Sequence, residues 1–425
     1  MRGRRQYARK GRRHGKGAIW LLSLGLPMFA SAMPLDQAVR AGLAIHPEVR
    51  SAMAEADRAG TEVEMAKGGY YPSVTMSGGP QEFDFGEIVY DLTASQMLYD
   101  WGRVTSKVDS ASATQRKLSE AVLVARDDAA LDIVETYLDV LASERRVEAV
   151  REHIQRLDGI REMTQARGGD GYADRSELDR ANLELSRAQE QLSLEKGNLQ
   201  DARNQYAILG GQEPADLVEP EPMSLQRYLA ASDMARVIRE SPLQRKALED
   251  ANVAEAEVRA AKASLLPQLN LAARALRREL GGHPESDSVV SLRFRMDTFQ
   301  GLSNFRRPTA AQQRLESAKW SADARQRDIR RQLQNLFDNG DTLRWREQSL
   351  TQQVTESEQV GELYREQFEV GRRDVIDLLN VQRERFEAER QLINLRIERK
   401  RIEYRAAAQV GLLGPLLENR LNHGS

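Results

Sequence analysis

Apolar residues recur at alternating steps of three and four along several long stretches, the pattern of helices that pack along one side as coiled coils. The first stretch, Val104 to Arg167, holds one glycine and no proline in 64 residues. It therefore predicts a helix of roughly 95 Å. Its apolar line has two hydroxyl-bearing members, Thr136 and Ser143. The line consists of Val122, Ala125, Ala129, Ile133, Thr136, Val140, Ser143, Val147, Val150, Ile154 and Leu157.

A glycine-rich turn, Gly168 to Gly171, follows this helix and predicts that the chain reverses there. The returning stretch carries a second apolar line with one polar member, Glu195. That line consists of Leu178, Ala181, Leu185, Ala188, Leu192, Glu195, Leu199, Ala202, Tyr206 and Leu209. The two stretches predict an antiparallel helical hairpin with small residues at its seam. The same plan recurs at Pro308 to Val370, the turn Gly371 to Arg373, and Asp374 to Val410.

Two ungapped matches identify a tandem duplication. At an offset of 195, identical pairs are Pro47/Pro242, Arg50/Arg245, Ala52/Ala247, Ala56/Ala251, Ala59/Ala254, Glu62/Glu257, Val63/Val258, Ala66/Ala261, Lys67/Lys262 and Pro72/Pro267. At an offset of 200, they are Gly171/Gly371, Asp174/Asp374, Leu178/Leu378, Glu184/Glu384, Ala188/Ala388, Gln191/Gln391 and Leu192/Leu392. We place the units at 33–223 and 224–421, with a short tail at 422–425.

Each unit begins with a helix, at 47–68 and 242–264, that ends before a proline. Apolar and polar residues then alternate at 269–275 and 290–297, which predicts strands with one apolar face. The counterparts at 73–77 and 91–99 alternate less cleanly. We expect one hairpin per unit, at 73–99 and 268–297, with tips near Gly78 to Gly86 and Gly281 to Asp287. The predicted fold is mostly α with a small β part.

These four strands have the length that a tilted membrane strand requires, but four strands cannot close a barrel. Membrane insertion would therefore require oligomerisation into a shared β-barrel. The residues expected to face its water-filled lumen are Arg274, Arg293, Arg295 and Asp297. Those expected to face lipid are Leu269, Leu271, Leu292 and Phe294. Aromatic residues expected near the membrane interface are Tyr70, Tyr71, Tyr90, Tyr99, Trp101 and Phe299. The alternative is a soluble sheet packed on the helices.

The first 32 residues carry eight basic side chains and no acidic ones, an apolar run over 18–30, and the ending Ala30-Ser31-Ala32. This pattern predicts a cleaved signal peptide at 1–32. Arg4-Arg5 and Arg12-Arg13 leave a twin-arginine route as the alternative to general secretion. Without this segment, 54 Lys and Arg stand against 64 Asp and Glu, a net charge of −10 that disfavours nucleic acid as a partner. The chain has no cysteine, so we expect no lipidated N-terminus.

The ordered motifs resemble the TolC family of outer membrane channels over essentially the whole mature chain. They are His46-Pro47-Glu48-Val49, Tyr70-Tyr71-Pro72-Ser73-Val74, Leu98-Tyr99-Asp100-Trp101-Gly102-Arg103 and Phe368-Glu369-Val370-Gly371. The resemblance implies a homotrimer in the cell outer membrane, with a twelve-strand barrel and a twelve-helix periplasmic tunnel. It also implies a periplasmic adaptor and an inner membrane ABC or other pump as partners.

Within that family, the Tyr-Asp-Trp-Gly segment and the absent cysteine resemble the type I secretion branch, whose members export proteins, and more narrowly a LapE-like adhesin exporter. One alternative is the outer membrane component of a drug or metal efflux pump. Another is a periplasmic coiled-coil adaptor, although the two hairpin-bearing units and the cleavable signal are unlike an adaptor.

Candidate chemistry is sparse, and we expect neither an enzyme nor a cofactor. The five histidines, at 14, 46, 153, 283 and 423, include no pair spaced as metal ligands or as a catalytic dyad. No phosphate-binding loop follows a predicted strand, so the energy for transport must come from a partner. His153 lies among charged residues, and we expect it to be solvated.

The far helical turns are the candidate periplasmic gate. Family members close this end with links between helix pairs and with acidic rings, and the resemblance places Glu177, Phe368 and Arg373 on the links and Asp377 on a ring. A second ring position is occupied by Asn380, which weakens the case for strong cation binding. The alternative is ordinary helix capping by Asp374 and Asp377 after the turn.

Overall fold

The computed structural model describes residues 33–81, 84–169, 175–214, 216–221, 225, 234–280, 283–296 and 302–422. The predicted signal peptide, Asp297 and Phe299 lie outside this range. In the first half of the chain, the elements are α1 (Leu35–Ile45), α2 (Pro47–Lys67), η1 (Gly68–Tyr70), β1 (Ser73–Gln81), β2 (Asp84–Tyr99), α3 (Arg103–Gly169) and α4 (Arg175–Gly210). In the second half they are α6 (Met234–Glu240), α7 (Pro242–Ala263), β3 (Gln268–Leu280), β4 (His283–Arg295), η2 (Leu302–Arg306), α8 (Arg307–Glu369), α9 (Val375–Gln409) and α10 (Leu413–Asn422).

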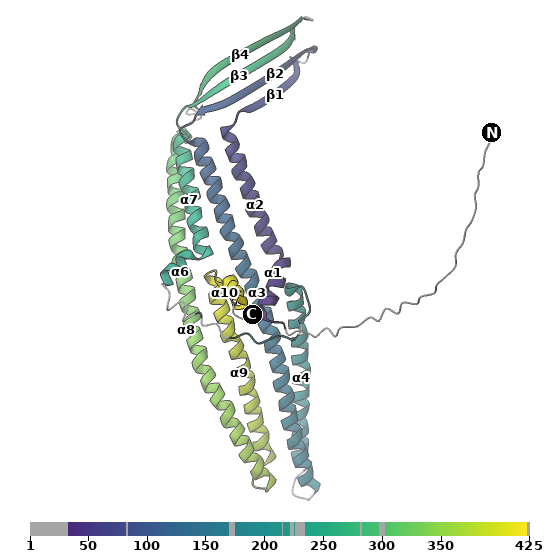
Figure 1. Ribbon diagram of the computed structural model, residues 1–425. Helices are drawn as coiled ribbons and strands as arrows, with labels where there is room; N and C mark the ends of the chain where they lie inside the picture. The colour runs from purple at the N-terminus through teal and green to yellow at the C-terminus, as the bar shows by residue number, and fades with distance from the viewer. Residues whose placement is uncertain are drawn as a thin grey trace, which may run out of the picture.

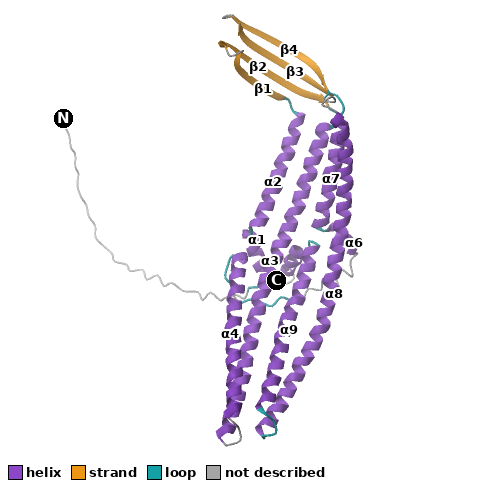
Figure 2. Cartoon of the chain, turned by 180° about the vertical axis from the view of Figure 1, so that it is seen from behind, coloured by secondary structure: helices purple, strands orange, loops and turns teal. Residues whose placement is uncertain are grey.

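The molecule is a long helical stalk with a β-sheet at one end, as Figure 1 and Figure 2 show. Near the sheet, α2 packs on α3, α3 on α7 and α7 on α8; beyond the middle, α4 packs on α3, α3 on α9 and α9 on α8. Only α3 and α8 run through both halves. At 67 residues, α3 is about 100 Å long. The predicted mostly-α fold with a small β part is confirmed.

The sheet is antiparallel with the strand order β1-β2-β3-β4, so the two hairpins of the duplicated units are joined through β2 and β3. The strands are longer than we expected. Gly78 and Gly79 belong to β1, Gly86 belongs to β2, and 283–287 belong to β4, so each hairpin reverses within the predicted range but over fewer residues than we expected. Backbone pairing continues beyond the point where the apolar alternation fades, because a ladder needs partners rather than particular side chains.

The largest buried cluster surrounds the middle of the stalk, where α1, α6 and α10 gather around the long helices. Tyr137 of α3 is fully buried there, and its single hydroxyl hydrogen is shared between the carbonyl oxygens of Met33 (2.9 Å) and Val218 (2.6 Å). Its ring meets that of Tyr206 edge to face. Glu195, the polar member of the α4 seam, is buried and accepts from Arg146 Nε at 3.0 Å, which satisfies its charge.

His153 contradicts our expectation of a solvated side chain. It is 7% exposed and its ring stacks on Phe386 of α9, with the centroids 4.4 Å apart. Burial, reinforced by the nearby Arg156 charge, lowers the pKa of His153 to about 4. The charged neighbours in sequence misled us because they occupy other faces of α3, whereas His153 points towards α9.

Candidate gate and two-faced sheet

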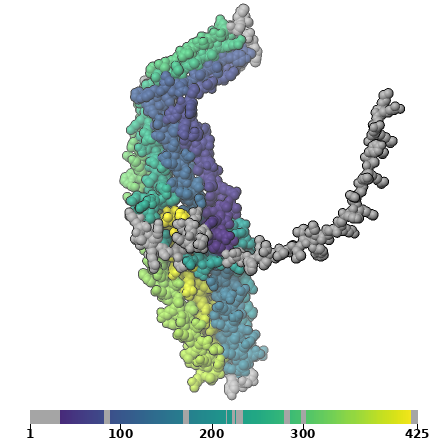
Figure 3. All heavy atoms as spheres, in the orientation of Figure 1, coloured from purple at the N-terminus to yellow at the C-terminus, as the bar shows by residue number. Residues whose placement is uncertain are grey.

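The strand register sorts the side chains of the sheet onto two faces. Leu269 lies opposite Phe294 and Leu271 opposite Leu292, so the four predicted lipid-facing residues share one face. We call this the apolar face; its other large apolar members include Val74, Met76, Tyr90, Leu92, Tyr99 and Val290, and one polar residue, Gln96, lies among them. Phe294 and Val290 are each 73% exposed. The sheet projects beyond the helical stalk (Figure 3), and no helix of the described residues packs extensively on it.

The opposite face, the polar face, carries Arg274, Arg293 and Arg295, three of the four residues predicted to face the lumen. Its neighbours from β1 and β2 include Ser73, Thr75, Ser77, Asp91, Thr93 and Ser95. Arg274 reaches across to Asp91 on β2, with Nε 2.9 Å from the carboxylate. The separation is not complete, since Val289 lies on the polar face and Arg277 lies near the tip on the apolar face.

Aromatic residues collect where the sheet meets the stalk. Tyr71 and Tyr99 are exposed, and the Tyr70 hydroxyl donates to Thr105 at 3.0 Å. Trp101 adopts a positive φ of 58°, and its indole N–H donates to the Pro267 carbonyl at 3.0 Å, tying the first unit to the second. Tyr90 lies within β2 instead, away from this junction.

Asp100 explains why the chain turns from strand into helix here. The side chain is 6% exposed and accepts from the backbone N–H groups of Gly102 (3.0 Å) and Val104 (2.6 Å), which caps the first turn of α3. The Tyr-Asp-Trp-Gly segment is thus a structural corner between β2 and α3.

At the far end of the stalk, Gly371 ends α8 with a φ of 75°. Its N–H donates to the Phe368 carbonyl, and the N–H of Arg372 donates to the Gln367 carbonyl at 2.8 Å, which satisfies the last turn of the helix. Asp374 then caps α9 by accepting from Ile376 N–H at 3.0 Å. The capping alternative is therefore correct for Asp374.

Arg373 and Asp377 are brought together, but not through helix capping. Arg373 Nη1 lies 2.8 Å from Asp377 Oδ2, and its Nε donates to Gln367 Oε1 at 3.0 Å. The guanidinium also stacks 3.9 Å over the ring of Tyr364. All three partners belong to the α8–α9 hairpin, so within one chain Arg373 joins these two helices.

Phe368 reaches the α3–α4 hairpin. It is fully buried in a cluster contributed by α3, α4 and α9, whose other members are Leu157, Ile160, Ala188, Val375, Leu378 and Leu379. Arg167, at the end of α3, places its guanidinium 4.3 Å over the Phe368 ring. Arg167 was not among the gate residues predicted from the sequence; its position beside the glycine-rich turn was the available signal.

Glu177, the remaining candidate, lies half-buried in the first turn of α4. One carboxylate oxygen, Oε2, is buried and accepts no hydrogen bond within the described part of the chain. The loop between α3 and α4, at 170–174, lies outside the described residues. Asn380 accepts from Arg383 at 3.0 Å, so this replacement of an acidic ring residue makes an ordinary local contact.

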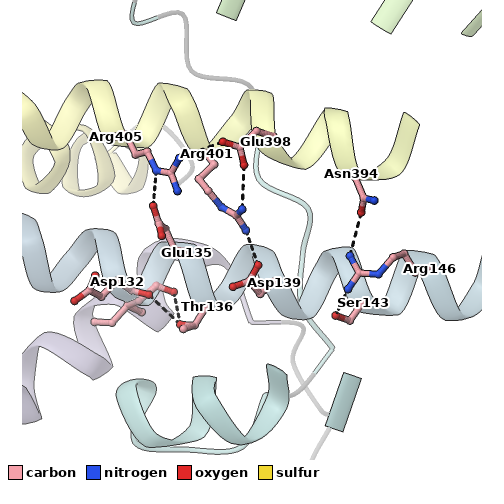
Figure 4. A network of polar contacts seen from close by, with 11 residues as sticks. Asp132, Glu135, Thr136, Asp139, Ser143, Arg146, Asn394, Glu398, Arg401 and Arg405 are labelled. Atoms are coloured by element: carbon pink, nitrogen blue, oxygen red, sulfur yellow. Dashed lines mark hydrogen bonds and ion pairs between the residues drawn. The ribbon is translucent and has the colours of Figure 1, made fainter. Parts of the chain in front are cut away.

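A ladder of ion pairs joins α3 to α9 at the middle of the stalk (Figure 4). Arg405 Nε lies 2.6 Å from Glu135, and Arg401 pairs with Asp139. Glu398 accepts from both arginines. These contacts hold the two hairpins together as far as the middle of the stalk.

The described residues contain no group of three or more His, Asp or Glu side chains placed to hold a metal ion. No helix among them combines the length and the apolar character that a membrane crossing needs.

Known proteins resemble this chain in sequence and in fold. A sequence profile of the outer membrane efflux protein family matches residues 39–211 and 236–411. The outer-membrane channel OprN is 19% identical, with 89% of each chain covered and a TM-score of 0.77. The outer membrane protein VceC from Vibrio cholerae is 17% identical over 89% of this chain and 96% of that one, with a TM-score of 0.75.

The open state of the Neisseria gonorrhoeae MtrE outer membrane channel is 16% identical over 89% of each chain, with a TM-score of 0.75. No curated protein matches significantly. The structural matches share the fold, and the profile covers most of the chain in both duplicated units. The chain belongs to the outer membrane efflux protein family, the TolC-like channels that its motifs resemble.

Proposed function

We propose that three copies of this chain form an outer membrane duct that carries a protein substrate of a type I secretion system out of the cell. The observation that carries this proposal is the sheet: it has an apolar face, a polar face and two unpaired edges, at the end of a helical stalk about 100 Å long. Such a sheet can lie in hydrocarbon only when its edges are paired.

Three copies of the four-stranded sheet supply twelve strands, with the apolar face of each towards lipid and Arg274, Arg293 and Arg295 towards the lumen. The stalks then form the periplasmic tunnel, and the turns with Phe368, Arg373 and Asp377 lie at its inner end as the gate. An adaptor and an inner membrane ABC or other pump supply the substrate and the energy.

The type I assignment is supported by the Tyr99-Asp100-Trp101-Gly102 segment and its likeness to that branch. The family description, which names efflux, favours a second candidate: export of small molecules such as drugs or metal ions. The two candidate functions predict different phenotypes when the gene for the channel is deleted.

The first experiment asks whether the protein fractionates with the outer membrane as a heat-modifiable trimer. We expect a trimer there; a monomer in the soluble periplasmic fraction contradicts the channel.

The second experiment deletes the gene. The mutant and the wild type are then compared for the large proteins that they secrete or display and for their resistance to dyes and metal ions. Loss of a large secreted protein with unchanged resistance supports type I secretion, and the reverse supports efflux. Reintroduced wild-type protein restores either phenotype, and Leu292→Arg serves as the assembly-deficient control.

A further inference from the structure

Two arginines without an acidic partner lie on the polar face of the sheet, at the end that adjoins the stalk. Arg293 and Arg295 are both exposed, and Arg293 Nε donates to Ser291 Oγ at 3.2 Å. Neither guanidinium forms an ion pair with another described residue. We call Arg293 and Arg295 the basic rim, because β4 ends at Arg295 and the chain returns from there to the stalk.

The positions opposite the basic rim carry amides, where carboxylates would neutralise it. Gln268 of β3 lies opposite the second arginine of the rim, and Asn270 lies opposite the first. The same two strands do form an ion pair nearer the tip, between Arg278 and Glu285 at 3.4 Å. Because opposite charges at facing positions stabilise a sheet, its stability alone does not account for a rim without partners.

The acidic groups of the polar face lie towards the tip. Asp91 of β2 and Asp287 of β4 both lie opposite Leu276 of β3, so the two carboxylates share one row. Asp287 is six residues from Arg293, which is roughly 20 Å along an extended strand. Charges in water are screened over about 8 Å at physiological ionic strength. Asp91 is in addition paired with Arg274. These acidic groups therefore leave the charge of the basic rim uncompensated.

The strand that would extend the sheet beyond β4 brings no acidic group either. In the proposed barrel that strand is β1 of another copy, because β1 and β4 are the free edges of the sheet. β1 contains no Asp or Glu, so no pairing register places a carboxylate beside the rim. Asp297, which lies outside the described residues, would offset only one of the two positive charges in each copy.

We infer that the basic rim is the selectivity element of the duct and that it favours anionic substrates, in the form of polypeptide segments rich in Asp and Glu. The inference rests on the proposed function, in which three copies bring two arginines each, and thus six guanidinium groups, to the stalk end of one lumen. On an open surface these charges would be screened. In a lumen with walls of low dielectric constant their field is focused, and arginine rings favour anions in pores for this reason.

The position of the rim fits a substrate that moves from the stalk towards the tip. A chain that leaves the helical tunnel meets the basic rim first, and the guanidinium groups attract its carboxylates. Beyond the rim, the arginines at 274 and 278 are already paired with Asp91 and Glu285. An acidic segment is therefore drawn into the barrel but is not held in its outer half, as conduction requires.

The ion selectivity of single channels tests the basic rim. Purified wild-type protein is inserted into planar lipid bilayers under a KCl gradient, and the reversal potential gives the permeability ratio of chloride to potassium. Replacing both Arg293 and Arg295 by Gln should lower this ratio about threefold or more, because the rim contributes to a potential of several kT. The matched control is Arg277→Gln. Arg277 is exposed in the same sheet on the apolar face, outside the proposed lumen, and its loss should leave the ratio unchanged.

Polyglutamate tests the substrate class. Added on the side of the sheet tip, it reaches the lumen without passing the candidate gate. It should block the wild-type channel at concentrations about threefold or more below those needed for the double glutamine variant. Polyphosphate, added in the same way, distinguishes carboxylates from phosphates. Block by polyphosphate without block by polyglutamate overturns the assignment to acidic polypeptides.

An unchanged permeability ratio in the double variant, or an equal fall in Arg277→Gln, overturns the basic rim and leaves the channel proposal standing. A wild-type protein that forms no conducting trimer overturns both. Trimer yield is measured for every variant. If the double glutamine variant assembles poorly, Arg293→Lys with Arg295→Lys keeps the charge and should restore both the yield and the ratio. A lysine variant that restores the yield without the ratio counts against the rim.

Discussion

The guanidinium of Arg167 lies 4.3 Å over the ring of Phe368, so the end of α3 is joined to the end of α8. Residues 201 positions apart thereby tie the two duplicated hairpins at the tip of the stalk. Arg373, in contrast, contacts Tyr364, Gln367 and Asp377 of its own hairpin. Arg167 thus joins the two hairpins to each other, whereas Arg373 joins the two helices of one hairpin.

Replacing Arg167 by alanine should loosen the tie between hairpins and raise single-channel conductance in lipid bilayers without loss of trimer. A cation over an aromatic ring contributes on the order of 0.5–2 kcal/mol, and symmetry repeats it in each copy. Arg167→Lys should restore closure only in part, because it lacks the planar group that stacks. Conductance equal to wild type in Arg167→Ala contradicts this role.

Arg373→Ala should also raise conductance, because Asp377 would lose its partner and the acidic groups of three copies would repel one another. Arg372→Ala is the control, since Arg372 lies beside it in the turn and is exposed. An equal rise in both variants would show that the turn is merely disturbed, and the gate role of Arg373 would be lost.

A charge on the apolar face should block assembly. Leu292→Arg should cost about 2–4 kcal/mol if the residue lies near the membrane midplane. Ser291→Arg places the same side chain on the polar face, one residue away, and should be tolerated. Trimer yields after membrane extraction measure both, and equal yields would reverse the assignment of the faces.

His153 predicts a loss of stability in acid. Its pKa is about 4 in the folded protein, against an ordinary value of 6.5. The unfolded chain therefore takes up the proton first, and stability falls as the pH drops from about 6.5 to 4, by about 3 kcal/mol in total. His153→Phe should remove that slope and keep the stacking on Phe386. Chemical denaturation of both proteins between pH 7 and pH 4 measures it, and parallel pH profiles would contradict the prediction.

Asp127 predicts the opposite slope. It is 7% exposed in the middle of the stalk, and burial raises its pKa to about 6, although it accepts a hydrogen bond from Gly414 N–H. The folded protein therefore holds the proton more tightly, and its stability falls as the pH rises from about 4 to 6. Asp127→Asn should be more stable than wild type at pH 7.5 and similar to it at pH 4. A variant less stable at both pH values would show that the charge is needed.

The helices are well predicted because their packing requires apolar residues at steps of three and four along the chain. α3 and α8 end within two residues of the expected positions. The sequence predicts the strand ends poorly. The alternation stops at Gly78 and before Val290, although the backbone pairing continues. Near the tip of the β3–β4 hairpin polar side chains occupy both faces, as Arg277 and Arg278 do, so no alternation marks the strand.

In the candidate gate, too, some contacts could be predicted from the sequence and others could not. The Arg373–Asp377 pair is four residues apart on the chain, within reach of local reasoning. The contact of Arg167 with Phe368 and that of His153 with Phe386 join segments that are distant in sequence. No local sequence pattern predicts such partners. Asp374 was predictable as a cap because an acidic residue before a helical stretch is a local signal.

The two unpaired strand edges also set the order of events in biogenesis. A lone sheet exposes the hydrogen-bonding groups of β1 and β4, which hydrocarbon does not accommodate. In the proposed channel, insertion of the strands is therefore coupled to their pairing with other copies, and its extent should depend on protein concentration. A single chain would then not open a pore, and a cell that makes too few copies would lack the duct without gaining a leak.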